Sequence, residues 1–309
     1  MRKENIAGSA MLVLTALIWG GAFVAQSTAM DHIGALTFNA VRFYIGALVL
    51  LPVIAFMDAG RKRRGVYEKP TRTQKRYLWI SGVLCGLALG CATLVQQYAI
   101  VYTTVGKAGF ITALYIVLVP IFSIFFGKKP APALWLCVAV AAAGLYFLCM
   151  TESFTISLGD GLAIVCSALF ALQIMLVSHF GPGCDSVRLS CIQFFVAGTL
   201  AGVLMLLFEE PTAQALWDGR WPILYTGVLS SGVAYTLQVV GQKRTNPVLA
   251  SLLMSLESVF ASLFGALILH QIPSGREITG CVLMFGAIIL AQVLPTEKKT
   301  PLPAQTKEE

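Results

Sequence analysis

Charged residues are scarce in this 309-residue chain: Asp, Glu, Lys and Arg together make up 12% of it, while 57% is hydrophobic. A typical soluble domain is about 25% charged and about 45–50% apolar. A soluble fold of this length could not solvate its surface with so little charge, whereas a surface that faces lipid needs none. The composition therefore argues against a soluble protein with one large core.

Cysteine and histidine are too few and too scattered to indicate a reactive site. The eight Cys show no CxxC spacing and the three His form no HExxH motif, so neither a disulfide framework nor a zinc site is indicated. Gly106–Lys107 is followed by Ala108, which is not a phosphate-binding loop, and Ser230–Ser231 lacks the GxSxG context of a nucleophile. We therefore expect no metal, no cofactor and no enzymatic activity.

Long apolar runs are what the chain has in abundance. A helix needs about 20 mostly apolar residues to cross a bilayer. Ten stretches have about this length: 6–28, 35–57, 77–99, 107–126, 132–150, 160–179, 187–208, 221–241, 248–269 and 275–294. They must be helices, because a lipid-facing strand or loop would leave backbone polar groups unpaired. The sequence predicts an all-α membrane protein with ten transmembrane helices.

The net charge of +7 could suggest a nucleic-acid partner, but the placement of the basic residues indicates a membrane orientation instead. Arg220 and Arg276 fall on one predicted side, and Arg42 and Lys107 lie within predicted helices. The other eighteen of the 22 Lys and Arg residues fall on the opposite side: Arg2, Lys3, Arg61, Lys62, Arg63, Arg64, Lys69, Arg72, Lys75, Arg76, Lys128, Lys129, Arg188, Lys243, Arg244, Lys298, Lys299 and Lys307. By the positive-inside rule, we expect both termini in the cytoplasm, with the cell membrane as the location and the lipid bilayer, not nucleic acid, as the partner.

The chain reads as two similar halves. Trp19 and Phe170 lie in similar segments 151 residues apart, and the same offset separates Phe43 from Phe194. Each half would hold five spans, an odd number, so the second would enter the membrane inverted. We expect one five-helix repeat over 6–150, a second over 158–294 and a polar cytoplasmic tail over 295–309.

Several motifs carry a family resemblance. They are ALIWGGAF (Ala16–Phe23), VRF (Val41–Phe43), TTVGKAGFITALYIVLVP (Thr103–Pro120) and RTNPVLASLLMSLESVFASLFG (Arg244–Gly265). With these motifs the chain resembles the EamA-like members of the drug/metabolite transporter superfamily, over about residues 6–294. The resemblance implies two inverted five-helix repeats and a secondary transporter that exports amino acids or related small metabolites by alternating access. The chain departs from the family pattern at Ser258, at His270–Gln271 and at Lys128–Lys129.

Ionisable residues inside the predicted helices are the main site candidates. Glu257 lies about ten residues into an apolar helix, where a carboxylate costs about 2.5–3.5 kcal/mol to insert. Loss of hydration favours its neutral form, which suits a proton carrier. Arg42 could pair with Glu257, snorkel or bind an anionic group, and Lys107 could do the same or reach the interface. A structural ion pair remains the alternative for all three residues.

Uncharged polar and aromatic side chains complete the candidate binding or coupling set: Trp19, Gln26, Gln97, Tyr115 and Gln238. Each could bond a substrate, or simply join neighbouring helices. A small-molecule substrate, with proton coupling through Glu257, is the function that these residues favour. The alternative is a polytopic membrane protein that does not transport, either a lipid-modifying enzyme or a sensor.

The predicted topology can be tested by labelling. Cys184 should lie in a cytoplasmic loop, as should both termini and Arg61–Arg76. In intact cells, a variant that keeps Cys184 alone should therefore resist a membrane-impermeant maleimide. Strong labelling from outside would contradict the orientation.

Overall fold

The computed structural model describes residues 3–102, 105–127, 130–149, 157–269 and 274–294, without the side chains of 3–5, 105–107, 149, 268 and 269. In these ranges the chain is helical, without strands. The helical elements are α1 (Lys3–Met30), α2 (Ala35–Arg63), α3 (Arg72–Tyr102), α4 (Val105–Ala113), α5 (Tyr115–Phe125), α6 (Pro132–Cys149), α7 (Leu158–Phe180), η1 (Gly181–Gly183), α8 (Ser186–Phe208), α9 (Ala213–Asp218), α10 (Arg220–Leu224), η2 (Tyr225–Tyr235), α11 (Thr236–Gln242), α12 (Pro247–Met254), α13 (Leu256–Leu269) and α14 (Gly275–Val293). The expected all-α architecture is confirmed.

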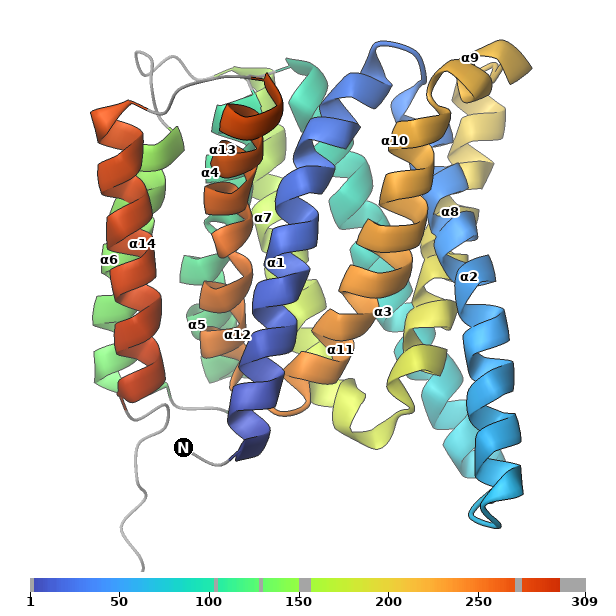
Figure 1. Cartoon of the computed structure of the whole chain (residues 1–309). Helices are drawn as coiled ribbons and strands as arrows, with labels where there is room; N and C mark the ends of the chain where they lie inside the picture. The colour runs from blue at the N-terminus through green and yellow to red at the C-terminus, as the bar shows by residue number, and fades with distance from the viewer. Residues whose placement is uncertain (1–2, 103–104, 128–129, 150–156, 270–273, 295–309) are drawn as a thin grey trace, which may run out of the picture.

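Nine helical stretches within the described ranges are long and apolar enough to cross a membrane. They cover the predicted spans except the fifth, which the structure gives as a shorter apolar helix over Pro132–Leu148. The long helices stand side by side and roughly parallel (Figure 1). The chain is thus a multi-pass membrane protein, because side-by-side apolar helices of this length need a bilayer around them.

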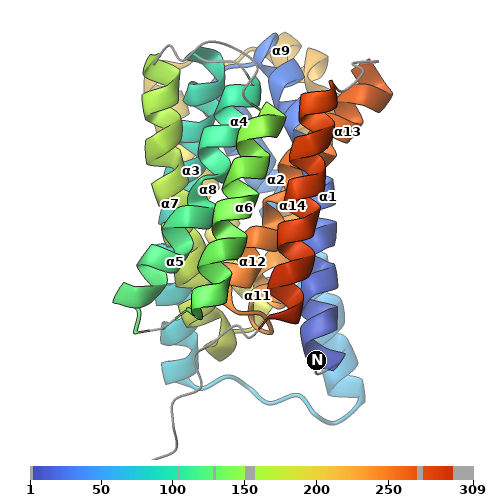
Figure 2. The same ribbon diagram turned by 90° about the vertical axis from the view of Figure 1, so that its left-hand side faces the viewer.

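Helices from the first part of the chain pack mainly against helices from the second. The extensive pairs are α1 with α13, α2 with α8, α3 with α7, and α6 with α14. Figure 2 shows α6 and α14 side by side at the front of the bundle. The interior is therefore built jointly by residues before 150 and after 157, and a cavity within it is lined from both.

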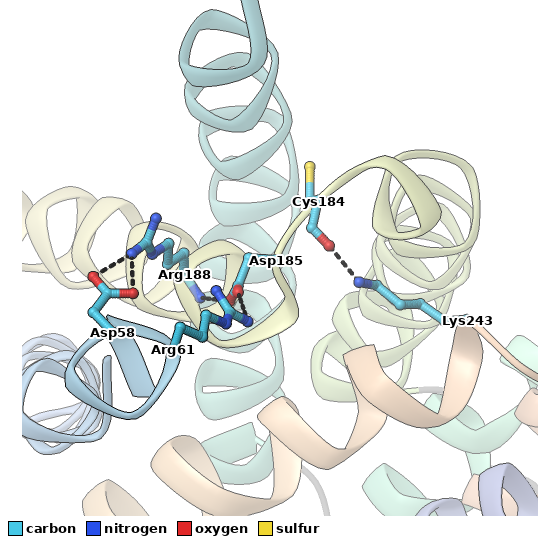
Figure 3. Close-up of polar contacts among 6 residues, drawn as sticks. All are labelled: Asp58, Arg61, Cys184, Asp185, Arg188 and Lys243. Carbon is cyan, nitrogen blue, oxygen red and sulfur yellow. Dashed lines mark hydrogen bonds and ion pairs between the residues drawn. The ribbon is translucent and has the colours of Figure 1, made fainter. Parts of the chain in front are cut away.

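Basic residues gather at one end of the bundle, which we call the basic end. It holds the connection between α2 and α3, the start of α8 and the turn that carries Lys243 (Figures 1 and 3). The opposite end, the far end, holds α9 and the start of α14. The described basic residues are thus concentrated at one end of the bundle, as the sequence predicts.

Helix α2 is tied to the second half of the chain at both ends. At its start, the carboxylate of Glu209 accepts hydrogen bonds from the backbone N–H groups of Leu36 (2.9 Å) and Thr37 (2.8 Å). At its other end, Asp58 accepts from Arg188 at 2.5 and 2.6 Å, and Arg61 is 3.0 Å from Asp185 (Figure 3). These ties hold α2 in register with α8 along its whole length.

The carboxyl of Asp185 is ionised in this cluster. Burial alone would raise its pKa, but the hydrogen bonds and charges of Arg61 and Arg188 outweigh burial and lower the pKa below its usual value. The same side chain caps α8, since it accepts from the N–H of Arg188 at 3.2 Å. One carboxylate therefore starts α8 and fastens it to α2.

Cys184 lies next to this cluster, and its backbone carbonyl accepts a hydrogen bond from Lys243 (Figure 3). Its side chain is only 7% exposed, and burial raises the pKa of the thiol. Such a thiol reacts slowly with a maleimide from either side. Val66, 64% exposed in the α2–α3 connection, is a better reporter of topology after Val66→Cys in a cysteine-free chain.

Two predicted spans are interrupted in the middle. The fourth consists of α4 and α5, which meet at Leu114, and the ninth consists of α12 and α13, which meet at Ser255. Tyr115 directly follows the first interruption, and Glu257 lies two residues beyond the second. Both interruptions are local, because Leu114 and Ser255 keep right-handed helical backbone angles and the N–H of Ser255 still donates to the carbonyl of Ser251 at 3.0 Å.

Glycines at positions 20 and 21 let α1 approach its neighbours closely. A Cβ on Gly20 would lie 2.5 Å from the Cβ of Phe260 and 2.8 Å from the backbone nitrogen of Ala261 on α13. A Cβ on Gly21 would lie 2.5 Å from the hydroxyl of Tyr225, which donates to the carbonyl of Ile18 at 2.9 Å. The two glycines after Trp19 thus set how near the helix of Glu257 comes to α1.

Gly20→Ala should lower the free energy of unfolding by about 1–3 kcal/mol, because the new methyl group meets the backbone of α13. Gly60→Ala is the matched control, since a Cβ there would have nothing within 4 Å and alanine is the better helix former. Thermal unfolding of the detergent-solubilised variants would measure both changes. Equal stability of the two variants would contradict close packing at Gly20.

Candidate functional site

A cavity between the two halves collects most of the side chains that the sequence singles out. It is lined by six of the predicted residues: Trp19, Gln26, Arg42, Tyr115, Gln238 and Glu257. These residues come from α1, α2, α5, α11 and α13, so a single chamber is shared by segments far apart in the sequence. Their common location makes the cavity the candidate site.

Arg42 is buried, with 2% of its surface exposed. Its Nη1 donates to the side-chain oxygen of Gln26 at 3.1 Å, and its guanidinium carbon lies 4.8 Å from the ring centroid of Phe43 and 5.2 Å from that of Phe38. Its Nε and Nη2 have no hydrogen-bond partner among the described residues. These two nitrogens form one edge of the guanidinium, and that edge matches the two oxygens of a carboxylate.

Glu257 is also buried, at 7% exposure. Its Oε1 accepts a hydrogen bond from the hydroxyl of Tyr115 at 3.1 Å. The described part of the chain contains no ion pair between Glu257 and Arg42, so the direct pair left open by the sequence is not formed. Both ionisable side chains instead line the same cavity, and the Nε and Nη2 of Arg42 have no partner among the described residues.

Aromatic rings lie beside these two side chains. Tyr235 ends η2 and lines the cavity together with Arg42 and Glu257, and its ring centroid is 6.4 Å from that of Phe43. Its ring centroid is 4.6 Å from that of Trp19, whose indole N–H donates to the carbonyl of Ser230 at 3.4 Å. The π-helical turns of η2 place Ser230 and Tyr235 on the cavity, which agrees with the frequent occurrence of such turns at functional sites.

Two predicted residues are placed differently. Gln97 is fully buried on α3, and neither of its amide atoms has a hydrogen-bond partner in the part of the chain that the structure describes, but the cavity is lined by its neighbour Gln96. Lys107 belongs to α4, and its side chain lies outside the described residues. The role expected for Lys107 therefore stays a prediction.

Sequence reasoning did not select several lining residues: Gln96, Phe170, Gln173, Ser230 and Tyr235. Phe170 had a signal, because it matches Trp19 at the 151-residue offset, and both line the cavity. Gln173 is a polar residue within an apolar helix, the same signal that selected Gln238, to which it is hydrogen-bonded at 3.1 Å. Among the described residues, no group of three His, Cys, Asp or Glu side chains could hold a metal ion.

The cavity is narrow in this conformation, with a volume of about 30 Å³. A cavity needs roughly 10–15 Å³, measured in the same way, to hold one buried water. The chamber therefore holds about two waters and no larger molecule. Any substrate that reaches Arg42 and Glu257 must therefore enter a wider conformation.

Comparison with known proteins identifies the family. The profile of the EamA-like transporter family matches residues 6–150 and again 157–292. An uncharacterized transporter of Archaeoglobus fulgidus is 30% identical, with 91% of this chain and 84% of that protein covered. The threonine/homoserine exporter RhtA of Escherichia coli is 26% identical over 92% of this chain and 88% of its own length.

A solved structure has a similar fold. A crystal structure with 19% sequence identity matches with a TM-score of 0.75 and covers 93% of this chain and 96% of its own. At that identity the likeness concerns the fold alone. The profile matches and the relatives confirm the resemblance found in the sequence motifs: this chain is a membrane transporter and belongs to the EamA-like transporter family.

Proposed function

We propose that this protein is a secondary transporter that exports amino acids or closely related zwitterionic metabolites across the cell membrane. The observation that carries the proposal is the placement of Arg42 and Glu257, two buried opposite charges on one cavity without an ion pair between them. A zwitterion brings one partner for each charge. Its carboxylate fits the free Nε and Nη2 edge of Arg42, and its ammonium group fits the Glu257 carboxylate.

Other substrate classes fit this cavity less well. A lipophilic cation would leave the free edge of Arg42 buried and unpaired, and a simple anion would add a second negative charge near Glu257. A zwitterion adds no net charge to a site that excludes water. The description of the relative RhtA as a threonine/homoserine exporter supports the same class.

Alternating access is supported by the narrow cavity and by the interrupted helices. Leu114 and Ser255, where the two helices break, are 141 residues apart, as are Gln97 and Gln238. We take this offset to reflect two inverted five-helix repeats over 6–150 and 158–294, with α6 as the tenth span. Rocking of these repeats about the cavity would expose Arg42 and Glu257 to each side in turn.

The orientation follows from charge. With the basic end in the cytoplasm, both termini are cytoplasmic and the positive-inside rule is obeyed. Glu257 then gives the cycle a means of coupling, because a proton and the substrate ammonium group compete for one carboxylate. Export of one zwitterion can in this way be exchanged for entry of one proton.

Reconstitution into proteoliposomes tests this function. The purified protein should exchange neutral amino acids across the membrane, and a pH gradient should drive their net movement. A quaternary-ammonium dye should be moved poorly. Good transport of the dye with no transport of any carboxylate-bearing compound would contradict the proposal.

The variant Glu257→Gln isolates the coupling step, because it keeps a hydrogen-bonding oxygen near Tyr115 but cannot titrate. It should lose transport driven by a pH gradient while it retains exchange at raised substrate concentration. Glu210→Gln, at an exposed carboxylate at the far end, is the matched control and should behave as the wild type. Unchanged pH dependence in Glu257→Gln would remove Glu257 from the mechanism, and reduced expression with normal coupling would make it a structural residue.

A further inference from the structure

Two glutamines that line the cavity carry polar side-chain atoms without hydrogen-bond partners among the described residues. Gln173 of α7 is 0% exposed and Gln238 of α11 is 1% exposed, and both line the cavity with Arg42 and Glu257. The Nε2 of Gln238 donates to the Oε1 of Gln173 at 3.1 Å. This bond fixes the two amide groups side by side.

Each amide of the pair leaves one polar atom unused. The Nε2 of Gln173 and the Oε1 of Gln238 have no hydrogen-bond partner among the described residues. Exchanging the oxygen and nitrogen in both amides preserves the bond between them and again leaves one free donor and one free acceptor. Buried polar groups are nearly always satisfied, so a paired free donor and acceptor on a cavity wall require a partner.

Few chemical groups can satisfy both of these amide atoms. A hydroxyl or carboxamide group can accept from one amide and donate to the other, and so satisfies both. A carboxylate only accepts and an ammonium group only donates, so either would leave one amide atom unpaired. An aliphatic side chain would leave both amide atoms unpaired. Its binding would therefore be weakened by the free-energy cost of two buried polar atoms without hydrogen bonds.

We propose that Gln173 and Gln238 form a side-chain subsite that selects amino acids bearing a hydroxyl or carboxamide group. The inference rests on the proposed function, because it requires the zwitterionic end of the substrate to occupy Arg42 and Glu257. The amide pair would then meet the substrate side chain from α7 and α11, whereas Arg42 and Glu257 line the same cavity from α2 and α13. Discrimination comes from the hydroxyl or amide group and not from side-chain size.

Threonine and valine provide the direct test, because they are nearly equal in shape and differ by a hydroxyl in place of a methyl group. In proteoliposomes loaded with radiolabelled threonine or valine, the wild-type protein should transport threonine with about tenfold or greater preference, as expected for one or two net hydrogen bonds. Gln173→Met and Gln238→Met keep the side-chain length and remove the amide. Each should bring the threonine-to-valine ratio close to one, mainly by weakening the transport of threonine.

Gln242→Met is the matched control. Gln242 lies one turn beyond Gln238 on α11 and is 3% exposed, and its amide also has no partner within the described ranges, but it does not line the cavity. This variant should keep the wild-type ratio. If the ratio changed equally in all three variants, the effect would come from general packing around α7 and α11 and the subsite would be refuted.

The wild-type measurement separates this inference from the function on which it rests. Equal transport of threonine and valine by the wild type would refute the subsite, assign water as the partner of the amides and leave amino-acid transport standing. Transport of no neutral amino acid, with asparagine and glutamine assayed beside threonine and valine, would refute the proposed function itself. Because these two outcomes need only the wild-type protein, the inference can still be refuted if a Gln173 or Gln238 variant folds poorly.

Discussion

Two ionisable side chains of opposite type, Arg42 and Glu257, share a water-poor cavity without forming an ion pair in the described part of the chain, and the rest of this structure depends on that constraint. A charged side chain in the middle of an apolar bundle costs several kcal/mol unless it is compensated. Arg42 is compensated by Gln26 and by two aromatic rings, and Glu257 by the hydroxyl of Tyr115. This compensation is partial, because the free edge of Arg42 remains unpaired. The free edge of Arg42 thus stays available for hydrogen bonds that a direct ion pair with Glu257 would have used.

The packing of the helices holds these two side chains apart. Helix α2, which carries Arg42, is fixed to α8 by Glu209 at one end and by Asp58 and Arg61 at the other. Helix α13, which carries Glu257, is drawn against α1 through Gly20. Side chains from both parts of the chain therefore converge on one chamber. Movement of these two helix pairs relative to each other would change the separation of Arg42 and Glu257.

Much of this arrangement could be predicted from the sequence, because lipid imposes strong rules. Hydropathy placed the spans, and the cost of burying charge pointed to Arg42 and Glu257. Hydropathy could not show the breaks at Leu114 and Ser255, since neither residue is Pro or Gly. Nor could it choose between Gln96 and Gln97: neighbours on a helix point about 100° apart, and the face that meets the cavity depends on packing with other helices. In the described conformation Arg42 and Glu257 form no ion pair, and the structure identifies Gln173, whose partner lies 65 residues away.

Equilibrium binding to the purified protein tests the central claim, that the two charges jointly recognise a zwitterion, most directly. Threonine, 1-amino-2-propanol and 3-hydroxybutyrate share the same hydroxyl, while the second lacks the carboxylate and the third lacks the ammonium group. Isothermal titration calorimetry with the three ligands should give an affinity for threonine at least about tenfold higher than for either analogue, since each analogue leaves one buried charge unpaired. Binding of either analogue as tightly as threonine would contradict the account, because one of the two charges would then have no part in recognition.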